Sequence, residues 1–371
     1  MRLGELNISH NHLTAVTGLE SLSSLKTLDL ASNHLNTLSV SRLLRQLCTL
    51  KLSNNQLRTL NVSMFSSLSL LYLDRNFLST VSGLEQCTRL ESLSIRDQQQ
   101  TGVDIDLGLV KDIRKVYLSS NRISPQTLSP SVPLLDLQLL DVASCAVHKL
   151  PSDFAAKFPN VKVLNLNFNS LSDLDELATA HCLGRLAVAG NRIARMRKLC
   201  QVITRMAKGG CVLCEIDLRG NPLTVGFHAP LVTGSGRMRE KTSGEGNGRT
   251  EAAHDWAITT QKTEEERMST MAGGNNDEKG VIVQVNDPYT LPLADPVTDR
   301  EYLSTLDEST RLRRKVLELM LYVGSRGSIK VLDGLALQLD DGDDSDVDRI
   351  LAKLEDLGVL KPRQTKKSIT E

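Results

Sequence analysis

The sequence predicts an α/β fold, a leucine-rich-repeat solenoid, from three observations: a recurrent leucine pattern, its steady period and a polar residue at one place in each unit. The pattern L-x-x-L-x-L-x-x-N-x-L returns about ten times, at steps of 21 to 24 residues and a last step of 30. A period close to 22 residues is typical of a solenoid in which each repeat packs on its neighbours. The first apolar position is occupied by Leu3, Leu25, Leu47, Leu68, Leu90, Ile113, Leu137, Val161, Leu183 and Leu213.

The second repeat shows why these spacings are needed. Leu28 and Leu30 alternate as residues of a strand do, so both point into the interior of the coil. Leu35 and Leu38 return from the far side to meet them. One repeat cannot enclose a core, but strands stacked about 4.8 Å apart bury a continuous apolar column. We therefore expect a parallel sheet on the concave side.

The asparagine of each unit is predicted to satisfy backbone groups at the turn after each strand. A buried amide both donates and accepts hydrogen bonds, so it can serve groups that have no partner in the sheet. Gln98 stands at this position in the fifth unit and Cys145 in the seventh. Because the fifth unit also lacks its following leucine, we expect a local bulge or loop there. The predicted ladder is Asn11, Asn33, Asn55, Asn76, Asn121, Asn169, Asn191 and Asn221.

Charge and hydropathy exclude several classes of partner. The chain of 371 residues carries 44 basic and 44 acidic side chains, so its formal net charge is zero. Such a balance draws it neither to nucleic acid nor to an anionic membrane. No apolar run approaches the roughly 18 residues of a membrane-spanning helix, and the first residues do not read as a signal peptide. We expect an intracellular protein with protein partners, no nucleic acid and no membrane.

The cysteine and histidine side chains that could bind a metal or take part in catalysis are scattered along the sequence. The seven cysteines suit a reducing compartment, and the close pair Cys211 and Cys214 lacks the two further ligands that a zinc site needs. The seven histidines lie mostly in predicted turns, and the sequence contains neither a metalloprotease helix motif nor a phosphate-binding loop. The sequence therefore predicts no enzyme, no metal site and no cofactor.

The chain divides into four segments where the composition changes. Residues 1–230 hold the repeats, whereas residues 231–280 are rich in Gly, Ser, Thr, Lys and Glu. The latter bury too little apolar surface to offset the entropy of ordering them, which predicts a disordered insertion. Residues 281–338 are apolar again, and residues 339–371 form a tail that opens with an acidic run.

Residues 281–338 are predicted to cover the open end of the repeats. Alternating apolar residues over 281–285 indicate a short strand, and apolar residues over 299–323 indicate a helix. Residues 329–335 then have the shape of a last half-repeat. Because the end of a solenoid exposes apolar core, we expect these elements to form a helical C-terminal cap.

The two ends of the chain carry further expectations. The tail is predicted to contain an amphipathic helix that either packs on the cap or binds a partner. At the other end, Leu3 already occupies the first position of a repeat and no shielding segment precedes it, so we expect the chain to be a fragment of something longer. The apolar face of the tail helix comprises Val347, Ile350, Leu351, Leu354 and Leu357.

The residues after the last repeat resemble a known family. Together with the repeats, they look like the C-terminal repeat domain of fungal spindle-pole-body scaffolds of the septation initiation network and the mitotic exit network, which are related to animal centriolin. The resemblance implies a scaffold in the cytoplasm and cytoskeleton, at the spindle pole body, with spindle-pole components and mitotic signalling GTPase or kinase modules as partners. The residues that carry it are Glu215–His228, Pro288-Tyr289, Leu291-Pro292, Asp299-Arg300-x-Tyr302, Arg311–Val316 and Lys330–Leu335.

Outward residues of the predicted strands form the candidate binding surface, because they lie on one curved and ordered face. Most are small or polar. In the middle repeats, however, aromatic, basic and apolar side chains meet on adjacent strands, and tyrosine and arginine are enriched at binding hot spots. We expect this patch to bind a partner segment, acidic or phosphorylated; the alternative is that these are ordinary exposed strand residues. The patch is Leu70, Tyr72, Arg96, Lys115, Tyr117 and Leu139.

Regulation and a second functional class remain open. Ser124 and Ser129 each precede a proline, which fits the minimal pattern of a proline-directed kinase, and both are expected on an accessible loop after the sixth strand. The 22-residue unit also resembles soluble leucine-rich-repeat regulatory subunits of protein phosphatases. Such a protein would form a tight complex with one catalytic subunit instead of acting as a scaffold.

Overall fold

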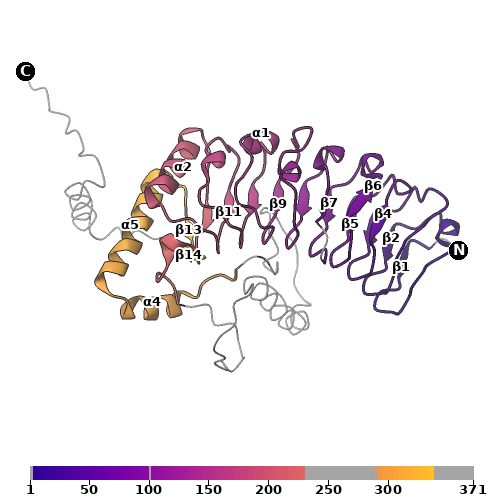
Figure 1. Ribbon diagram of the computed structural model, residues 1–371, viewed down its shortest axis with the longest axis horizontal. Helices are drawn as coiled ribbons and strands as arrows, with labels where there is room; N and C mark the ends of the chain where they lie inside the picture. Colours follow the sequence, from indigo (N-terminus) through magenta and orange to yellow (C-terminus); the bar gives the residue numbers. More distant parts are fainter. Residues whose placement is uncertain (1–2, 100–101, 230–288, 290, 338–371) are drawn as a thin grey trace, which may run out of the picture.

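A computed structural model describes residues 3–99, 102–229, 289 and 291–337. The chain forms a curved solenoid in which short strands stack side by side, while turns and short helices return along the outer side (Figure 1). This arrangement confirms the predicted leucine-rich-repeat solenoid.

The strands of the repeats are three residues long and belong to one large sheet. Its strands are β1 (Glu5–Asn7), β2 (Thr27–Asp29), β3 (Thr49–Lys51), β5 (Leu70–Tyr72), β7 (Ser92–Ser94), β8 (Lys115–Tyr117), β9 (Leu139–Asp141), β10 (Val163–Asn165), β11 (Arg185–Ala187), β12 (Glu215–Asp217), β13 (Val331–Leu332) and β14 (Leu335–Ala336). Neighbours pair in parallel in this order, and the last pair alone is antiparallel.

The outer side of the solenoid is less regular. It carries a second, two-stranded parallel sheet of β4 (Thr59–Asn61) and β6 (Thr80–Ser82), and the helices α1 (Phe154–Lys157) and α2 (Met196–Lys208). One-turn 3₁₀ helices lie at Leu19–Ser21, Leu84–Gln86, Leu107–Leu109, Pro125–Leu128, Asp175–Leu177 and Pro222–Thr224.

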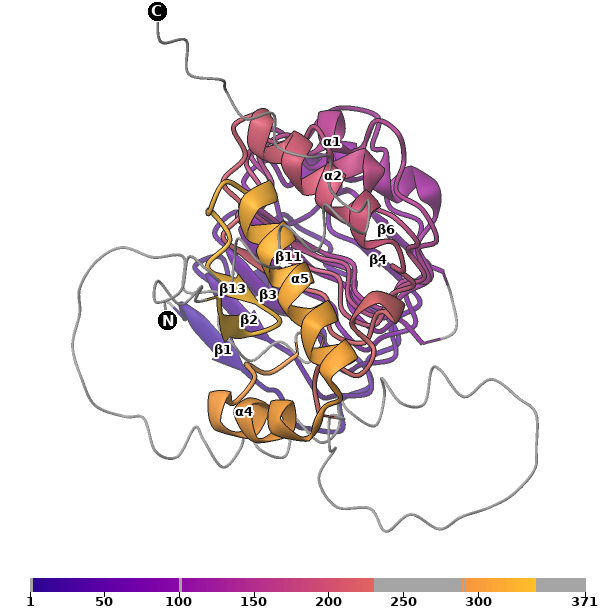
Figure 2. The same ribbon diagram turned by 90° about the vertical axis from the view of Figure 1, so that its left-hand side faces the viewer.

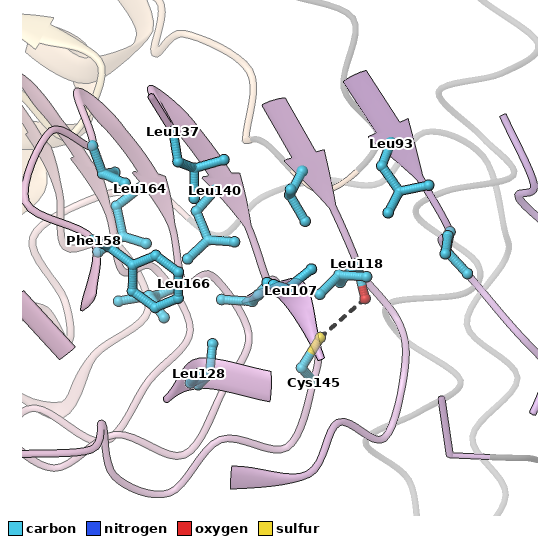
Figure 3. Close-up of a cluster of buried hydrophobic side chains, with 14 of the residues drawn as sticks. Leu93, Leu107, Leu118, Leu128, Leu137, Leu140, Cys145, Phe158, Leu164 and Leu166 are labelled. Atoms are coloured by element: carbon cyan, nitrogen blue, oxygen red, sulfur yellow. Dashed lines mark hydrogen bonds between the residues drawn. The ribbon is translucent and has the colours of Figure 1, made fainter. Parts of the chain in front are cut away.

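The core is the apolar column that the leucine pattern predicts. Leu28, Leu30 and Leu35 are fully buried, and Leu38 is 8% exposed. The register keeps equivalent residues in line, since Leu28 of β2 lies beside Leu50 of β3. Figure 3 shows the same packing in the middle repeats, where leucines from the strands meet leucines and a phenylalanine from the return side.

The asparagine ladder is present, and Asn55 shows its geometry. Its Oδ1 accepts from the backbone N–H of Leu35 in the preceding repeat (2.9 Å). Its Nδ2 donates to the carbonyls of Leu30 (2.9 Å) and Leu52 (3.0 Å). Seven predicted members are buried; Asn11 is the exception, because it is exposed and its Nδ2 bonds only carbonyls within its own repeat.

Gln98 continues the ladder, whereas residues 100–101, which follow it where a bulge or loop is expected, lie outside the described residues. Its Oε1 accepts from the N–H of Leu78 (3.0 Å), and its Nε2 donates to the carbonyl of Leu73 (2.9 Å). The side chain is 3% exposed. A glutamine amide has the same donors and acceptor as asparagine, and here it reaches the same groups.

Cys145 also fills its predicted rung. Its Sγ donates to the carbonyl of Leu118 (3.2 Å; Figure 3), and its N–H donates to Oδ1 of Asn169 (3.0 Å). Burial raises the pKa of the thiol to about 12. The group therefore stays protonated and keeps its hydrogen for the carbonyl.

The cap contains two helices where the sequence predicted one over 299–323. Helix α4 spans Pro296–Thr305, and helix α5 spans Glu308–Gly324. The Asp307 carboxylate between them accepts from the N–H of Thr310 (3.0 Å). An aspartate in this position satisfies an unpaired donor of the first turn, so it starts a new helix.

The cap closes the end of the solenoid as predicted. Helix α5 lies across the last repeats and packs against α2 (Figure 2). Leu317, Leu321 and Leu332 are buried there. Strand β13 extends the sheet beyond β12, with Val331 beside Glu215, which confirms the expected half-repeat.

A network of ionisable side chains, of which Arg314 and Asp333 are buried and His228 and Asp299 half-buried, joins the last repeat to the cap. The Nδ1 of His228 lies 3.2 Å from Asp299 of α4, and its Nε2 lies 2.8 Å from Asp333 in the β13–β14 turn. Arg314 of α5 forms two hydrogen bonds with Asp299 (3.0 and 2.7 Å). Burial alone would raise the pKa of Asp299, but the bonds from Arg314 and the contact with His228 hold it below its usual value.

Three further predictions lie outside the described residues. They concern the disordered insertion over 231–280, the strand over 281–285 and the tail over 339–371 with its amphipathic helix.

Candidate protein-interaction surface

The face of the large sheet that points away from the core, here called the concave face, carries the predicted patch. In the nine three-residue strands from β2 to β12 of this sheet the middle residue is buried, and the two flanking residues point to this face. The register places Leu70, Ser92, Lys115 and Leu139 in one row across β5, β7, β8 and β9. Tyr72, Ser94, Tyr117 and Asp141 form the next row.

The structure places five of the six patch residues on β5, β8 and β9 and Arg96 two residues after β7, but their exposure differs. Lys115 is exposed, and Leu70, Tyr72 and Tyr117 are half-buried. Leu139 is only 8% exposed, which corrects the expectation of an exposed apolar side chain there. The surface that a partner can reach at this place is therefore formed mainly by β5 and β8.

Arg96 is occupied by contacts within the chain. Its Nη2 lies 3.1 Å from the Asp141 carboxylate, and its guanidinium lies over the rings of Tyr117 (4.5 Å) and Tyr289 (5.5 Å). Its side chain is 16% exposed. The expectation that this charge serves an acidic partner is thus corrected: Arg96 pairs with Asp141 and supports two aromatic rings.

Hydrogen bonds extend from Arg96 across neighbouring strands. Asp74 accepts from the hydroxyl of Ser94 (2.6 Å) and from the N–H of Arg96 (2.8 Å). Burial raises the pKa of Asp74, although the charge of Arg96 opposes this effect. Asp141 also accepts from the Ser119 hydroxyl. The middle of the concave face is therefore a connected polar network.

A segment from beyond the repeats lies on the concave face. We call Tyr289, Leu291 and Pro292 the strap. Figure 1 shows the orange chain before α4 running back along the strands toward β9. Tyr289 and Leu291 are 9% and 6% exposed, respectively. Burial raises the pKa of the Tyr289 hydroxyl, so it is neutral at physiological pH.

Side chains of the sheet bind the backbone of the strap. The carbonyl of Tyr289 accepts from Nδ2 of Asn167 (3.0 Å) and Nδ2 of Asn165 (3.3 Å). The carbonyl of Pro292 accepts from Nη1 of Arg219 (2.8 Å). Arg219 is itself held by Asp217 through two bonds of 3.0 and 2.6 Å.

Backbone N–H groups orient the two asparagines. The Oδ1 of Asn165 accepts from the N–H of Asn167 (3.1 Å), and the Oδ1 of Asn167 accepts from the N–H of Ala189 (2.7 Å). Because the oxygens are held against the sheet, the NH₂ groups point toward the strap. The donors are therefore in place for a backbone carbonyl.

Gly334 lets the strap end close to the cap. Its φ is +82°, and a Cβ on this residue would lie 2.8 Å from the backbone nitrogen of Ala294. A side chain does not fit so close to a backbone atom, and the left-handed conformation also favours glycine. The Asp-Gly ending of the cap therefore fits the close approach of the segment that follows the strap.

The strap was missed as part of the surface in the sequence analysis. Pro288-Tyr289 and Leu291-Pro292 entered only among the residues that carry a family resemblance. Asn167 and Tyr289 are 122 positions apart, and no periodic pattern links them. The signal that could have been used is the asparagine pair itself, since Asn165 and Asn167 place two amide NH₂ groups on the outward face of a single repeat.

The two predicted phosphorylation sites are less accessible than expected. Ser124 and Ser129 flank the one-turn helix Pro125–Leu128, and both are half-buried. The hydroxyl of Ser129 donates to the Asp153 carboxylate (2.7 Å), and that of Ser124 lies 3.5 Å from Asp104. A phosphate on either serine would stand beside a carboxylate, which disfavours it by like-charge repulsion.

Outside the concave face, the described side chains that could bind a metal or react do not form such a site. Among the described residues, no three His, Cys, Asp or Glu side chains are grouped as metal ligands. Cys211 is buried with its Sγ 3.1 Å from the carbonyl of Leu183, whereas Cys214 is exposed. No helix in the described part of the chain is long and apolar enough to cross a membrane.

An open hollow of about 430 Å³ lies at the turns that follow β1, β2, β3 and β5. His12 and His34 stack there with ring centroids 5.3 Å apart, and Nδ1 of His12 lies 3.1 Å from Nε2 of His34. Arg75 and Phe77 line the same hollow. It is separate from the strap.

Comparison with known proteins identifies a relative. The chain is 38% identical over 234 residues to the septation initiation network scaffold protein cdc11 of Schizosaccharomyces pombe. The match covers 63% of this chain and 22% of the relative, so the chain spans less than a quarter of that protein. The matched part of this chain is therefore similar to this scaffold, in agreement with the resemblance seen in the sequence. No protein-family profile matches the chain.

Two solved structures are similar to parts of this chain, and the first is named as a leucine-rich-repeat protein. LIC12759 of Leptospira interrogans is 25% identical with a TM-score of 0.48, over 58% of this chain and 55% of that one. Human 5T4 is 21% identical with a TM-score of 0.41, over 59% of this chain and 77% of that one.

Proposed function

We propose that this chain, which is similar to part of the cdc11 scaffold, is a protein-interaction scaffold of septation initiation and mitotic exit signalling. The 38% identity to that scaffold is the observation that carries the proposal. The solenoid fits the role, because its concave face is ordered before binding and loses little conformational entropy when a partner docks.

The proposed location is the cytoplasm and cytoskeleton, at the spindle pole body. The proposed partners are spindle-pole components and the GTPase or kinase modules of mitotic signalling. In this proposal partners bind at the concave face around β5 and β8, where Lys115 is exposed and Tyr72 is half-buried. Lys115 would pair with an acidic or phosphorylated group, while Tyr72 packs on apolar surface.

The first experiment tests the class of protein. The full-length protein, tagged at its own locus, is used for proximity labelling in dividing cells, and its position is imaged in the same strain. Enrichment of spindle-pole components together with a focus at the poles is expected. A diffuse signal dominated by one phosphatase catalytic subunit would overturn the proposal in favour of the phosphatase-regulator alternative.

A second experiment tests the surface. The double variant Tyr72→Ala and Lys115→Glu should lower recovery of labelled partners at least tenfold, since hot-spot residues each contribute about 2 kcal/mol or more. Lys111→Glu is the matched control, because Lys111 is an exposed lysine of the same repeat outside the sheet. Both variants should melt at the wild-type temperature. Unchanged recovery by the double variant would exclude this part of the concave face.

A further inference from the structure

The strap site is built to hold an extended backbone. We define the strap site as Asn165, Asn167 and Arg219, together with Tyr117 and with Arg96, whose guanidinium lies over the rings of Tyr117 and Tyr289. The first three donate to carbonyl groups of the strap at 2.8 to 3.3 Å. Carbonyl groups are common to every peptide, so these bonds give affinity, while the ring and leucine of the strap give specificity.

Asn165 provides more than the fold requires. At the equivalent place in other repeats, Asp29 and Asp141 accept from the N–H two residues later at 3.1 and 3.2 Å. Asn165 accepts the same bond at 3.1 Å and adds an NH₂ group that faces the strap. A carboxylate would satisfy the sheet equally well. The donor of Asn165 therefore serves the bound segment and not the solenoid.

Small residues lie beside these donors. The register places Ala187 next to Asn165, and the backbone N–H of Ala189 bonds the side chain of Asn167. Both alanines are buried, at 7% and 0% exposure. Short side chains at these positions let a peptide backbone approach the amides, whereas larger ones would hold it away.

We propose that the strap site binds an extended protein segment in which an aromatic residue is followed, two positions later, by leucine and proline, and that the strap occupies this site until such a segment replaces it. This inference deepens the proposed scaffold function and rests on it for the class of partner. The aromatic ring stacks on the Arg96 guanidinium, and the carbonyls bond the asparagine and arginine side chains.

The strap belongs to the same chain as its site, and its competition with a free segment sets the expected change in affinity. A tethered segment acts at an effective concentration of the order of 1 mM. A free segment with a Kd of about 10 µM for the open site would therefore bind about 100-fold more weakly while an equally good strap is present. Opening the strap should be visible as a large gain in affinity.

The test uses the 371-residue chain and one synthetic probe. The probe is a fluorescein-labelled peptide with the sequence of residues 286–294, and its binding is followed by anisotropy. The strap variant Tyr289→Ala and Leu291→Ala should bind it at least tenfold more tightly than the wild type does. A probe with the same two residues changed to alanine should not bind.

One further variant tests the site itself. Asn165→Asp, added to the strap variant, keeps the acceptor that the sheet uses and should abolish binding of the probe, because a carboxylate repels a carbonyl. If the double strap variant has a lower melting temperature than the wild type, the probe affinity of the single variant Tyr289→Ala is compared with that of the wild type instead. Equal affinity of the wild type and the strap variant, or no binding by a folded strap variant, would overturn the inference.

The outcomes separate the two proposals. If a folded strap variant does not bind the probe while the wild type still labels spindle-pole components in cells, the peptide-site inference is wrong and the scaffold proposal stands. A wild-type protein without pole enrichment removes the scaffold proposal, and the anisotropy measurement still decides whether the site binds a peptide.

Discussion

A side-chain amide stabilises the turn that follows the strand in every repeat except the seventh, where Cys145 takes its place, and Asn76 is the clearest case. It is 0% exposed, accepts from the N–H of Leu57 (3.0 Å) and donates to the carbonyls of Leu52 (3.0 Å) and Leu73 (2.9 Å). Alanine at this position would leave all three backbone groups without these bonds. Their loss affects two repeats at once, because Leu52 and Leu57 belong to the preceding one.

Asn76→Ala should therefore destabilise the protein strongly. Each buried backbone group that is left unpaired costs about 1–3 kcal/mol. Asn11→Ala is the matched control, since Asn11 is exposed, and its cost should stay near 0.5 kcal/mol. Urea unfolding of both variants measures the difference. Equal costs would show that the ladder position contributes little beyond its local bonds.

Among the elements, two one-turn helices on the outer side begin after a glycine in the left-handed conformation. Gly18 has φ +82° and Gly83 has φ +80°. A Cβ on Gly18 would meet nothing within 4 Å, whereas on Gly83 it would lie 2.5 Å from the backbone nitrogen of Ser63. The two positions share the backbone strain and differ in the space around them.

Gly18→Ala should cost about 1–2 kcal/mol, which is the strain of a left-handed alanine. Gly83→Ala should cost about 1–3 kcal/mol more, because the backbone of the neighbouring repeat has to move. Thermal unfolding of the two variants compares them directly. A smaller loss for Gly83→Ala than for Gly18→Ala would contradict the close packing of these repeats.

In the cap, Asp299 links stability to pH. Its pKa lies below the ordinary 3.8, so its contribution is complete above that value and is lost as the pH falls through the folded-state pKa. Asp299→Asn should cost about 2–3 kcal/mol at pH 7, because it removes the carboxylate that forms two hydrogen bonds with the buried Arg314 and leaves Glu318, at 3.0 Å, as its remaining charge partner. The stability gap between wild type and variant should shrink below pH 4. Melting temperatures from pH 7 to pH 3 test this, and a constant gap would refute it.

The strands and helices also show which structural features a repeated sequence pattern predicts. The strands, the core leucines and the buried asparagines were predicted because each depends on a local pattern that is repeated many times. The break at Asp307 was missed, since a helical apolar spacing over 299–323 continues through the capping residue. Gln98 keeps its place in the ladder because its side chain ends in the same amide group as asparagine.

For the whole molecule, the features that sequence reasoning could not supply are the long-range contacts. The bond from Asn167 to Tyr289 spans 122 positions, and that from His228 to Asp333 spans 105. Both bring residues after the repeats back onto them, and both cross the segment between the repeats and the cap. Periodicity predicts neighbours along the solenoid, but it contains no information on where a later segment returns.

The same architecture predicts how far a local loss of stability extends along the solenoid. In a solenoid each repeat contacts only its neighbours, so a local loss of stability should fade with distance. Arg314→Met removes the charge pair of α5 with Asp299 at the end of the sheet. Amide hydrogen exchange should then rise most in β13 and β12, less in β11, and not at all in β2 and β3.

Asn76→Ala gives the complementary pattern in the same measurement. Its amide joins the repeats of β3 and β5, so exchange should rise there and remain at the wild-type level in β12. A uniform increase across all strands in either variant would mean that the solenoid unfolds as one cooperative unit. In that case the cap would support the concave face at β5 and β8 as strongly as it supports the last repeat, and cap variants would weaken partner binding there as well.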